Sequence, residues 1–155
     1  MNNLENKNNL GNMKEHYDVY IASPFFNPEQ LERVEFIKSV LDKKGLTYYS
    51  PKDESVVSSD ADQDWRQAVL DGNVEAIKRS DMIVAVTNGK DMGTMVEFGM
   101  GVILGKKLFP FAEGLTGQFN LMLAVPAHAV FTSREQLESY DFNKCEKIVY
   151  KGDIE

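Results

Sequence analysis

The chain has 155 residues, a length that suits a single domain of ordinary size. Its 43% hydrophobic and 26% charged residues are typical of a globular protein in water, and no run of about 18 apolar residues is present to span a membrane. The net charge of −7 argues against binding to nucleic acid polymers, which depends on Lys and Arg.

The first residues differ in composition from the rest of the chain. Residues 1–16 are rich in Asn, Lys and Glu and show little hydrophobic periodicity, which predicts a flexible leader. The run 17–23, YDVYIAS, predicts a buried strand that Pro24 ends. We therefore expect one folded domain over residues 17–155.

A helix and a second strand are expected next. Asn27 is a typical N-cap, Pro28 suits the first helical position, and Gly45 suits the residue after a helix. Residues 46–49 predict a short strand. The polar, acidic stretch 52–63 predicts a long loop, and loops of this length are often functional.

The middle of the chain alternates between helix and strand patterns. Apolar spacing predicts a helix over residues 65–79, and the apolar run 82–86 predicts a strand. Another helix is expected over residues 94–104, followed by a strand over 107–111.

Shorter elements complete the pattern. Residues 119–124 predict a short helix or turn, residues 129–131 a short strand, and Ser133 the cap of a last helix through Leu137. The alternation predicts an α/β fold, a doubly wound parallel sheet of about five strands with helices on both faces. No G-x-G-x-x-G follows the first strand, so dinucleotide binding lacks its usual motif.

The helix around Glu97 has an unusual composition. It is apolar nearly all round, and Glu97 is the only ionisable residue in the stretch 92–105. A helix without a polar face is normally buried, and burial of an unpaired carboxylate costs several kcal/mol. Gly93, Gly99 and Gly101 leave room for a ligand or another backbone, which makes Gly93 a candidate substrate contact.

Two carboxylates are expected at one edge of the sheet. The Glu97 helix follows the carboxyl end of the strand 82–86, where ligands bind in open α/β sheets, and Asp91 lies at the helix start. Glycosidic chemistry uses one carboxylate to attack the anomeric carbon and others to hold hydroxyls or handle protons. Two structural alternatives stay open, namely Asp91 as a simple N-cap and Glu97 paired with Arg66, Arg79 or a lysine.

Three segments resemble the nucleoside 2-deoxyribosyltransferase family. Residues 91–99, DMGTMVEFG, are similar to the family signature, in which an Asp precedes a nucleophilic Glu by six positions. Residues 20–26, YIASPFF, are similar to the first strand and turn, and residues 120–122, NLM, to a segment contributed by a neighbouring subunit. The resemblance runs from about residue 17 to the C-terminus and implies a flavodoxin-like fold.

The resemblance implies a role for each matching residue. Glu97 would attack C1′ of the deoxyribose and release the first base, and a second base would attack C1′ in turn, with net retention. Asp91 would hold a sugar hydroxyl, and Tyr20 would hydrogen-bond Glu97. Phe25 and Phe26 would pack on the base or the pocket wall, the alternative being ordinary core packing.

The family also implies the partners of the chain. The substrates would be 2′-deoxynucleosides and free purine or pyrimidine bases. Asn120 would reach the sugar in a neighbouring subunit's site and Met122 would line that site, so an oligomer is expected, by family resemblance a hexamer of paired subunits.

We expect no metal, no organic cofactor and a cytoplasmic location. His16 and His128 lack the spacing of a pair of metal ligands, and nothing else in the sequence implies a cofactor. The lone Cys145 cannot form an internal disulfide, and the N-terminus lacks a basic region followed by a hydrophobic stretch.

The sequence departs from the family at two places. The family's Asp near the base aligns with Asn73, whose amide can hydrogen-bond a base but cannot supply a proton. On a helix, the nearby Asp71 points elsewhere. Residues 52–55, KDES, replace a segment in which the family often has a Gln, so base recognition should differ in detail. Another family feature is a C-terminal carboxylate that approaches the active site; by this resemblance residues 153–155 could supply one, the alternative being a frayed tail.

Two other functions stay open. A hydrolase of the N-glycosidic bond of nucleoside monophosphates would use the same fold and Glu97, but such relatives have a Ser where Asp91 stands. A carboxylate at that place repels a 5′-phosphate, which favours nucleosides as substrates. A non-catalytic nucleoside-binding module would need no Glu on an apolar helix, although Asn73 is compatible with it.

Overall fold

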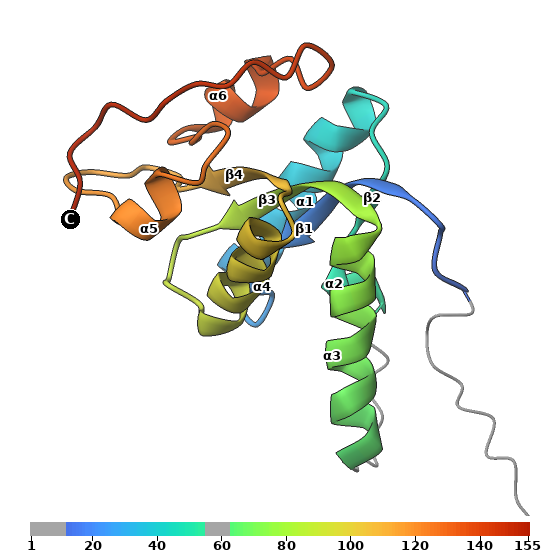
Figure 1. Cartoon of the computed structure of the whole chain (residues 1–155). Helices are drawn as coiled ribbons and strands as arrows, with labels where there is room; N and C mark the ends of the chain where they lie inside the picture. Colours follow the sequence, from blue (N-terminus) through green and yellow to red (C-terminus); the bar gives the residue numbers. More distant parts are fainter. Residues whose placement is uncertain (1–11, 55–62) are drawn as a thin grey trace, which may run out of the picture.

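The computed structural model describes residues 12–54 and 63–155, and its centre is a parallel sheet (Figure 1). The strands are β1 (Tyr17–Ala22), β2 (Tyr48–Tyr49), β3 (Ser80–Val86) and β4 (Lys107–Phe111). They lie in the order β2-β1-β3-β4, and every neighbouring pair is parallel. The predicted α/β fold is therefore confirmed, with four strands.

The expected fifth strand is reduced to one bridge. Phe131 pairs with Phe111 of β4 in parallel at a single position. Two backbone hydrogen bonds, from Phe131 to Pro110 and from Ala112 to Phe131, make this contact. The segment is too short to extend the sheet further because Ser133 begins the next helix.

Six helices surround the sheet within the described ranges. Their bounds are α1 (Pro28–Lys43), α2 (Pro51–Glu54), α3 (Gln63–Lys78), α4 (Met92–Ile103), α5 (Leu121–Ala124) and α6 (Arg134–Ser139). The predicted cap of α1 is confirmed, because the Asn27 side chain accepts from the Gln30 N–H and Pro28 is the first helical residue. Gly45 follows α1 with a φ of 70°, the left-handed conformation that favours glycine.

The predicted loop 52–63 is wrong at its start and lies mostly outside the described residues. Pro51 to Glu54 form one turn of helix, which Pro51 starts as a first helical residue. Residues 55–62 lie outside the described part of the chain.

Each face of the sheet carries its own apolar core. Alternate residues of the strands point to opposite faces, so Val19 and Val84 pack with Ile37 of α1 on one face. Tyr20 and Ile83 pack on the other face, together with buried residues of α3 and α4. Figure 1 shows α3 and α4 on the side of the sheet away from α1, as predicted for a doubly wound arrangement.

Helix α4 lies very close to the sheet on its inner side. A Cβ at Gly101 would lie 2.5 Å from Ile83 Cδ1 and 2.7 Å from Leu108 Cδ2, so the absence of a side chain permits this approach. The prediction that α4 is buried all round is wrong for the outer side of the helix, which is exposed. Met92 is 85% exposed and Ile103 87% exposed, because no other described segment of the chain covers that side.

The chain before β1 is described from residue 12 onward. Arg79 donates to the main-chain carbonyl of Lys14, and His16 pairs with Asp81, so these residues contact the amino end of the sheet. Residues 1–11, most of the expected leader, lie outside the described part, and the division at residue 17 stays a prediction. Within the described ranges, no helix is both long and apolar enough to cross a bilayer.

Candidate active site

Asp91 is the N-cap of α4 and stands at the carboxyl end of β3. Its Oδ2 accepts hydrogen bonds from the Thr94 N–H at 2.8 Å and from the Thr94 hydroxyl at 3.0 Å. The structural alternative of a helix cap is thus confirmed. Both bonds use Oδ2, and Oδ1 makes no hydrogen bond within the described residues, so Asp91 keeps an acceptor for a ligand. Gly93 lies beside it, with its Cβ position 3.2 Å from Asp91 Oδ2.

Glu97 lies six residues further along the chain, in the second turn of α4, and faces the sheet residue Tyr20. Glu97 Oε2 and the Tyr20 hydroxyl are both buried, and neither has a hydrogen-bond partner of good geometry among the described residues. The alternative of a structural ion pair with Arg79 is wrong, because Arg79 binds Glu75 at 2.8 Å instead. A buried polar atom without a partner destabilises the fold by about 1–3 kcal/mol. Two such atoms side by side are typical of a binding site in which a ligand supplies the missing partner.

The electrostatics of Glu97 differ from those of a surface carboxylate. Burial raises the pKa of Glu97 to about 7; the Tyr20 hydroxyl opposes this rise and the charge of Asp91 adds to it. Burial, followed by the charge of Glu97, raises the pKa of Tyr20 well above its usual value, so the phenol stays protonated. Tyr20, Asp91 and Glu97 therefore form one electrostatic unit.

Tyr49 is a member of this unit that the sequence did not reveal. It is the register partner of Tyr20 on the neighbouring strand, and the two rings stack at 5.6 Å with an interplanar angle of 13°. Burial, together with nearby negative charges that include Glu97, raises the pKa of Tyr49. The Cβ position of Gly72 on α3 lies 4.0 Å from the Tyr49 hydroxyl, so α3 borders the site here.

The other expected substrate contacts occupy different surroundings. Phe25 and Phe26 follow β1 with ring centroids 4.9 Å apart, and Phe26 is 74% exposed, so core packing is wrong for Phe26. Asn73 is half-buried on α3, next to Gly72. Asp71 accepts from Gln67 at 2.8 Å, a contact along the outer side of α3.

Asn120 and Met122 lie across α4 from Glu97. Asn120 caps α5 by accepting from the Met122 N–H, and Met122 is 73% exposed. Both residues line a hollow of about 900 Å³, which is also lined by Gly99 and by Glu155 at the end of the chain. Gly99 is two residues from Glu97, about 200° round the helix, so this hollow does not include Glu97 of the same chain.

The segment that replaces the family's Gln is bound to α1. Lys52 pairs with Glu35 at 2.8 Å, and Asp53 pairs at 2.8 Å with Lys38, whose side chain is 9% exposed. These ion pairs explain how α2 is held against α1, and the side chains of Lys52 and Asp53 are engaged there.

One group of metal-ligand residues exists in the described part of the chain, at the far edge of the sheet from Glu97. The ligand atoms of His16, Asp18 and Asp81 lie within 4.8 Å of one another, which the expectation of an isolated His16 had missed. The three residues come together because Asp18 and Asp81 lie on paired strands. His16 and Asp81 are exposed and pair with each other at 2.9 Å, while Asp18 accepts from Thr47.

The chain is similar to known proteins in both sequence and fold. The sequence profile of the nucleoside 2-deoxyribosyltransferase family matches residues 19–125. The solved structure of a 2-deoxyribosyltransferase from Bacillus psychrosaccharolyticus has 34% identical residues and a TM-score of 0.77, over 86% of this chain and 99% of that one.

Two more distant structures share the fold. A conserved protein from Enterococcus faecalis V583 has 18% identity and a TM-score of 0.67, over 79% of this chain and 95% of its own. A CMP N-glycosidase from Clostridium botulinum has 17% identity and a TM-score of 0.52, over 76% and 92% of the two chains. No curated protein sequence matches the chain.

Proposed function

The chain belongs to the nucleoside 2-deoxyribosyltransferase family, and from this premise we propose that it exchanges the base of 2′-deoxynucleosides through a deoxyribosyl ester on Glu97. The observation that carries the proposal is the buried, unpartnered Glu97 carboxylate beside Tyr20. A carboxylate with a pKa of about 7 is ionised in a useful fraction near neutral pH, and in a dry site its charge strongly stabilises a cationic sugar ring.

The reaction proceeds in two balanced steps. A Glu97 oxygen forms a bond to C1′ while the C1′–N bond breaks, and the bond's electron pair leaves on the base, which takes up a proton. A nitrogen of the incoming base then attacks C1′ from the other face and releases its proton, the ester bond breaks, and the electron pair of that bond returns to the Glu97 carboxylate. Two inversions at C1′ give net retention.

The sugar and base are held by residues around Glu97. The free Oδ1 of Asp91 accepts from a sugar hydroxyl, and Gly93 leaves the space beside Asp91 open. The Tyr20 hydroxyl lies beside Glu97 and would donate to it in the substrate complex, which would fix the Glu97 rotamer. The exposed Phe26 and its neighbour Phe25 offer ring faces to the base. Asn73 contributes a hydrogen bond to the base but no proton.

A second copy of the chain completes the site. Asn120 and Met122 line a hollow that excludes Glu97 of their own chain, and the adjoining side of α4 is apolar and exposed. Both features are accounted for when two copies pack α4 and α5 against each other, which brings Asn120 and Met122 of each copy to the Glu97 of the other. Burial of Met92 and Ile103 supplies the apolar contact for this association.

Hydrolysis is the second candidate, because the fold is shared with a CMP N-glycosidase. Water then replaces the incoming base in the second step. The carboxylate of Asp91 opposes a 5′-phosphate at the sugar, so nucleosides are the favoured substrates in either reaction.

The test is chromatography of 2′-deoxyinosine and adenine incubated with the intact protein or with Glu97→Ala. The proposal expects 2′-deoxyadenosine with the intact protein and none with the variant. Free hypoxanthine without exchange would establish the hydrolase instead. No turnover, even with a deoxynucleoside monophosphate, would leave a nucleoside-binding module.

A further inference from the structure

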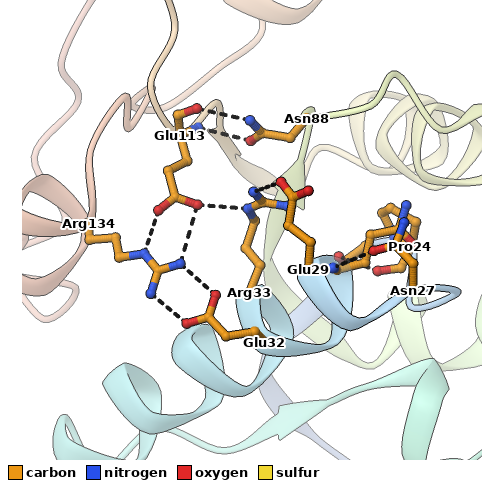
Figure 2. A network of polar contacts seen from close by, with 10 residues as sticks. Pro24, Asn27, Glu29, Glu32, Arg33, Asn88, Glu113 and Arg134 are labelled. Atoms are coloured by element: carbon orange, nitrogen blue, oxygen red, sulfur yellow. Dashed lines mark hydrogen bonds and ion pairs between the residues drawn. The ribbon is translucent and has the colours of Figure 1, made fainter.

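Glu113, two residues after β4, is the centre of a polar network at the carboxyl edge of the sheet (Figure 2). Its Oε2 accepts from Arg33 of α1 at 2.8 Å, and its Oε1 accepts from Arg134 at the start of α6. Hydrogen bonds from Arg134, which has the larger effect, and from Arg33 lower the pKa of Glu113, so the Glu113 carboxylate is charged at neutral pH. The side chain of Arg33 is only 8% exposed.

The outer members of the network fix these arginines. Arg134 binds both carboxylate oxygens of Glu32 at 2.7 Å, a bidentate pair, and Arg33 also binds Glu29 at 2.9 Å. Glu113 is therefore held from α1 and α6 at once, and its main chain has little freedom to move.

The main chain of Glu113 in turn holds the loop that leads to Asp91. The Asn88 side chain accepts from the Glu113 N–H at 3.0 Å and donates to the Glu113 carbonyl at 2.9 Å. Figure 2 shows the two groups facing each other as a double hydrogen bond. Asn88 belongs to the connection between β3 and α4, three residues before Asp91.

This connection is conformationally strained. Lys90, directly before Asp91, has a φ of 52°, a left-handed conformation that costs a residue with a side chain about 1–2 kcal/mol. Such a conformation persists only where its surroundings hold it. The loop is held at its start by Asn88 and at its end by the contacts of Asp91 with Thr94.

We propose that Asn88 is a positioning residue for substrate binding, locking the loop to the Glu113 main chain so that Asp91 Oδ1 faces the sugar. This inference rests on the proposed function, in which Asp91 binds a sugar hydroxyl. Without the Asn88 double hydrogen bond, the strained Lys90 relaxes and Asp91 spends less time in the position that binds the sugar. The affinity for the nucleoside then falls in proportion to the population of that position.

The first experiment compares Asn88→Ala with Glu32→Ala in steady-state base exchange. Asn88→Ala should raise KM for 2′-deoxyinosine about fivefold, the scale of one or two hydrogen bonds, with a smaller change in kcat. Glu32→Ala removes the outer pair with Arg134 but leaves the contacts of Glu113 with Arg33, Arg134 and Asn88 in place, so it should leave KM unchanged. Equal KM values for the intact protein and Asn88→Ala would overturn the inference, whereas absence of exchange by the intact protein would instead remove the proposed function.

The second experiment separates positioning from general stability. Calorimetry measures 2′-deoxyinosine binding to Glu97→Ala, which cannot react, with Asn88→Ala and Asp91→Ala added singly and together. Asn88→Ala should weaken binding about fivefold when Asp91 is present and less than about twofold when it is absent. The same loss in both backgrounds would show that Asn88 does not act through Asp91. Asn88→Asp keeps the acceptor but loses the donor, so it should weaken binding as well. This variant replaces Asn88→Ala in the same measurement if Asn88→Ala does not fold.

Discussion

At the scale of single residues, the burial of Glu97 sets both the stability and the chemistry of the site. A carboxyl whose pKa is raised in the folded state stays protonated to a higher pH there than in the unfolded chain. The folded state therefore loses stability as pH rises from about 4.5, the unfolded value, to about 7, and the loss is complete above that. If Glu97 acts as proposed, function and stability are opposed at this residue, as is common at active sites.

Replacement of Glu97 by Gln should stabilise the fold in a pH-dependent way. Above about pH 8 we expect the free energy of unfolding of Glu97→Gln to exceed that of the intact protein by about 1–3 kcal/mol, because the variant has no buried charge at this position. Near pH 5 the difference should shrink, since the native carboxyl is then protonated. Urea titrations at the two pH values measure it, and an equal difference at both would contradict the raised pKa.

The rate should follow the ionisation of the same carboxyl. In the proposed reaction the charged form of Glu97 is the nucleophile, so kcat/KM should rise with pH and level off above about 7. Asp91→Asn removes a charge that raises the Glu97 pKa and should move the inflection to lower pH. A profile that is flat between about pH 5 and 8 in the intact protein would argue that another group reacts.

We expect Asn73 to limit the release of the first base, because its amide cannot supply a proton. Asn73→Asp restores a group that can carry a proton near the base, and general acid catalysis of this kind contributes at least about a hundredfold where it operates. We expect the variant to raise kcat for exchange by about tenfold or more, with Asp71→Asn, a change on the outer side of α3, as the matched control. Unchanged rates in Asn73→Asp would mean that the proton comes from solvent or another acid.

At the scale of elements, α4 has two unlike sides. Its inner side is pressed on the sheet through Gly101, and its outer side exposes Met92 and Ile103. The sequence predicted an apolar helix that requires cover, but the pattern does not say whether the same chain or a second copy supplies it. The exposed side is therefore where association is expected.

Ile103→Glu should disrupt that association. A charge on the outer side of α4 would be buried between two copies, at a cost of several kcal/mol, so the variant should elute from gel filtration at a smaller size and lose most exchange activity. Val149→Glu, at a position 65% exposed on the C-terminal segment, is the control and should keep the parent size. Ile103→Glu with the size and activity of the parent would exclude this side of α4 as the contact.

At the scale of the whole molecule, local features were predictable and long-range pairings were not. The caps at Asn27, Asp91 and Ser133 are formed within three residues, and the structure confirms all three as helix starts. The register that places Tyr49 beside Tyr20, and the pairing of Asn88 with Glu113, join segments 25 or more residues apart. No local pattern specifies such pairs, because they depend on how the strands align in the sheet.

The most direct test of the account is mass spectrometry of the protein quenched during reaction with 2′-deoxyinosine and no acceptor base. The account predicts one deoxyribosyl group on the peptide that contains Glu97, formed together with an equivalent of hypoxanthine and absent from Glu97→Ala. Base release without any adduct, or exchange catalysed by Glu97→Ala, would contradict a covalent intermediate on Glu97.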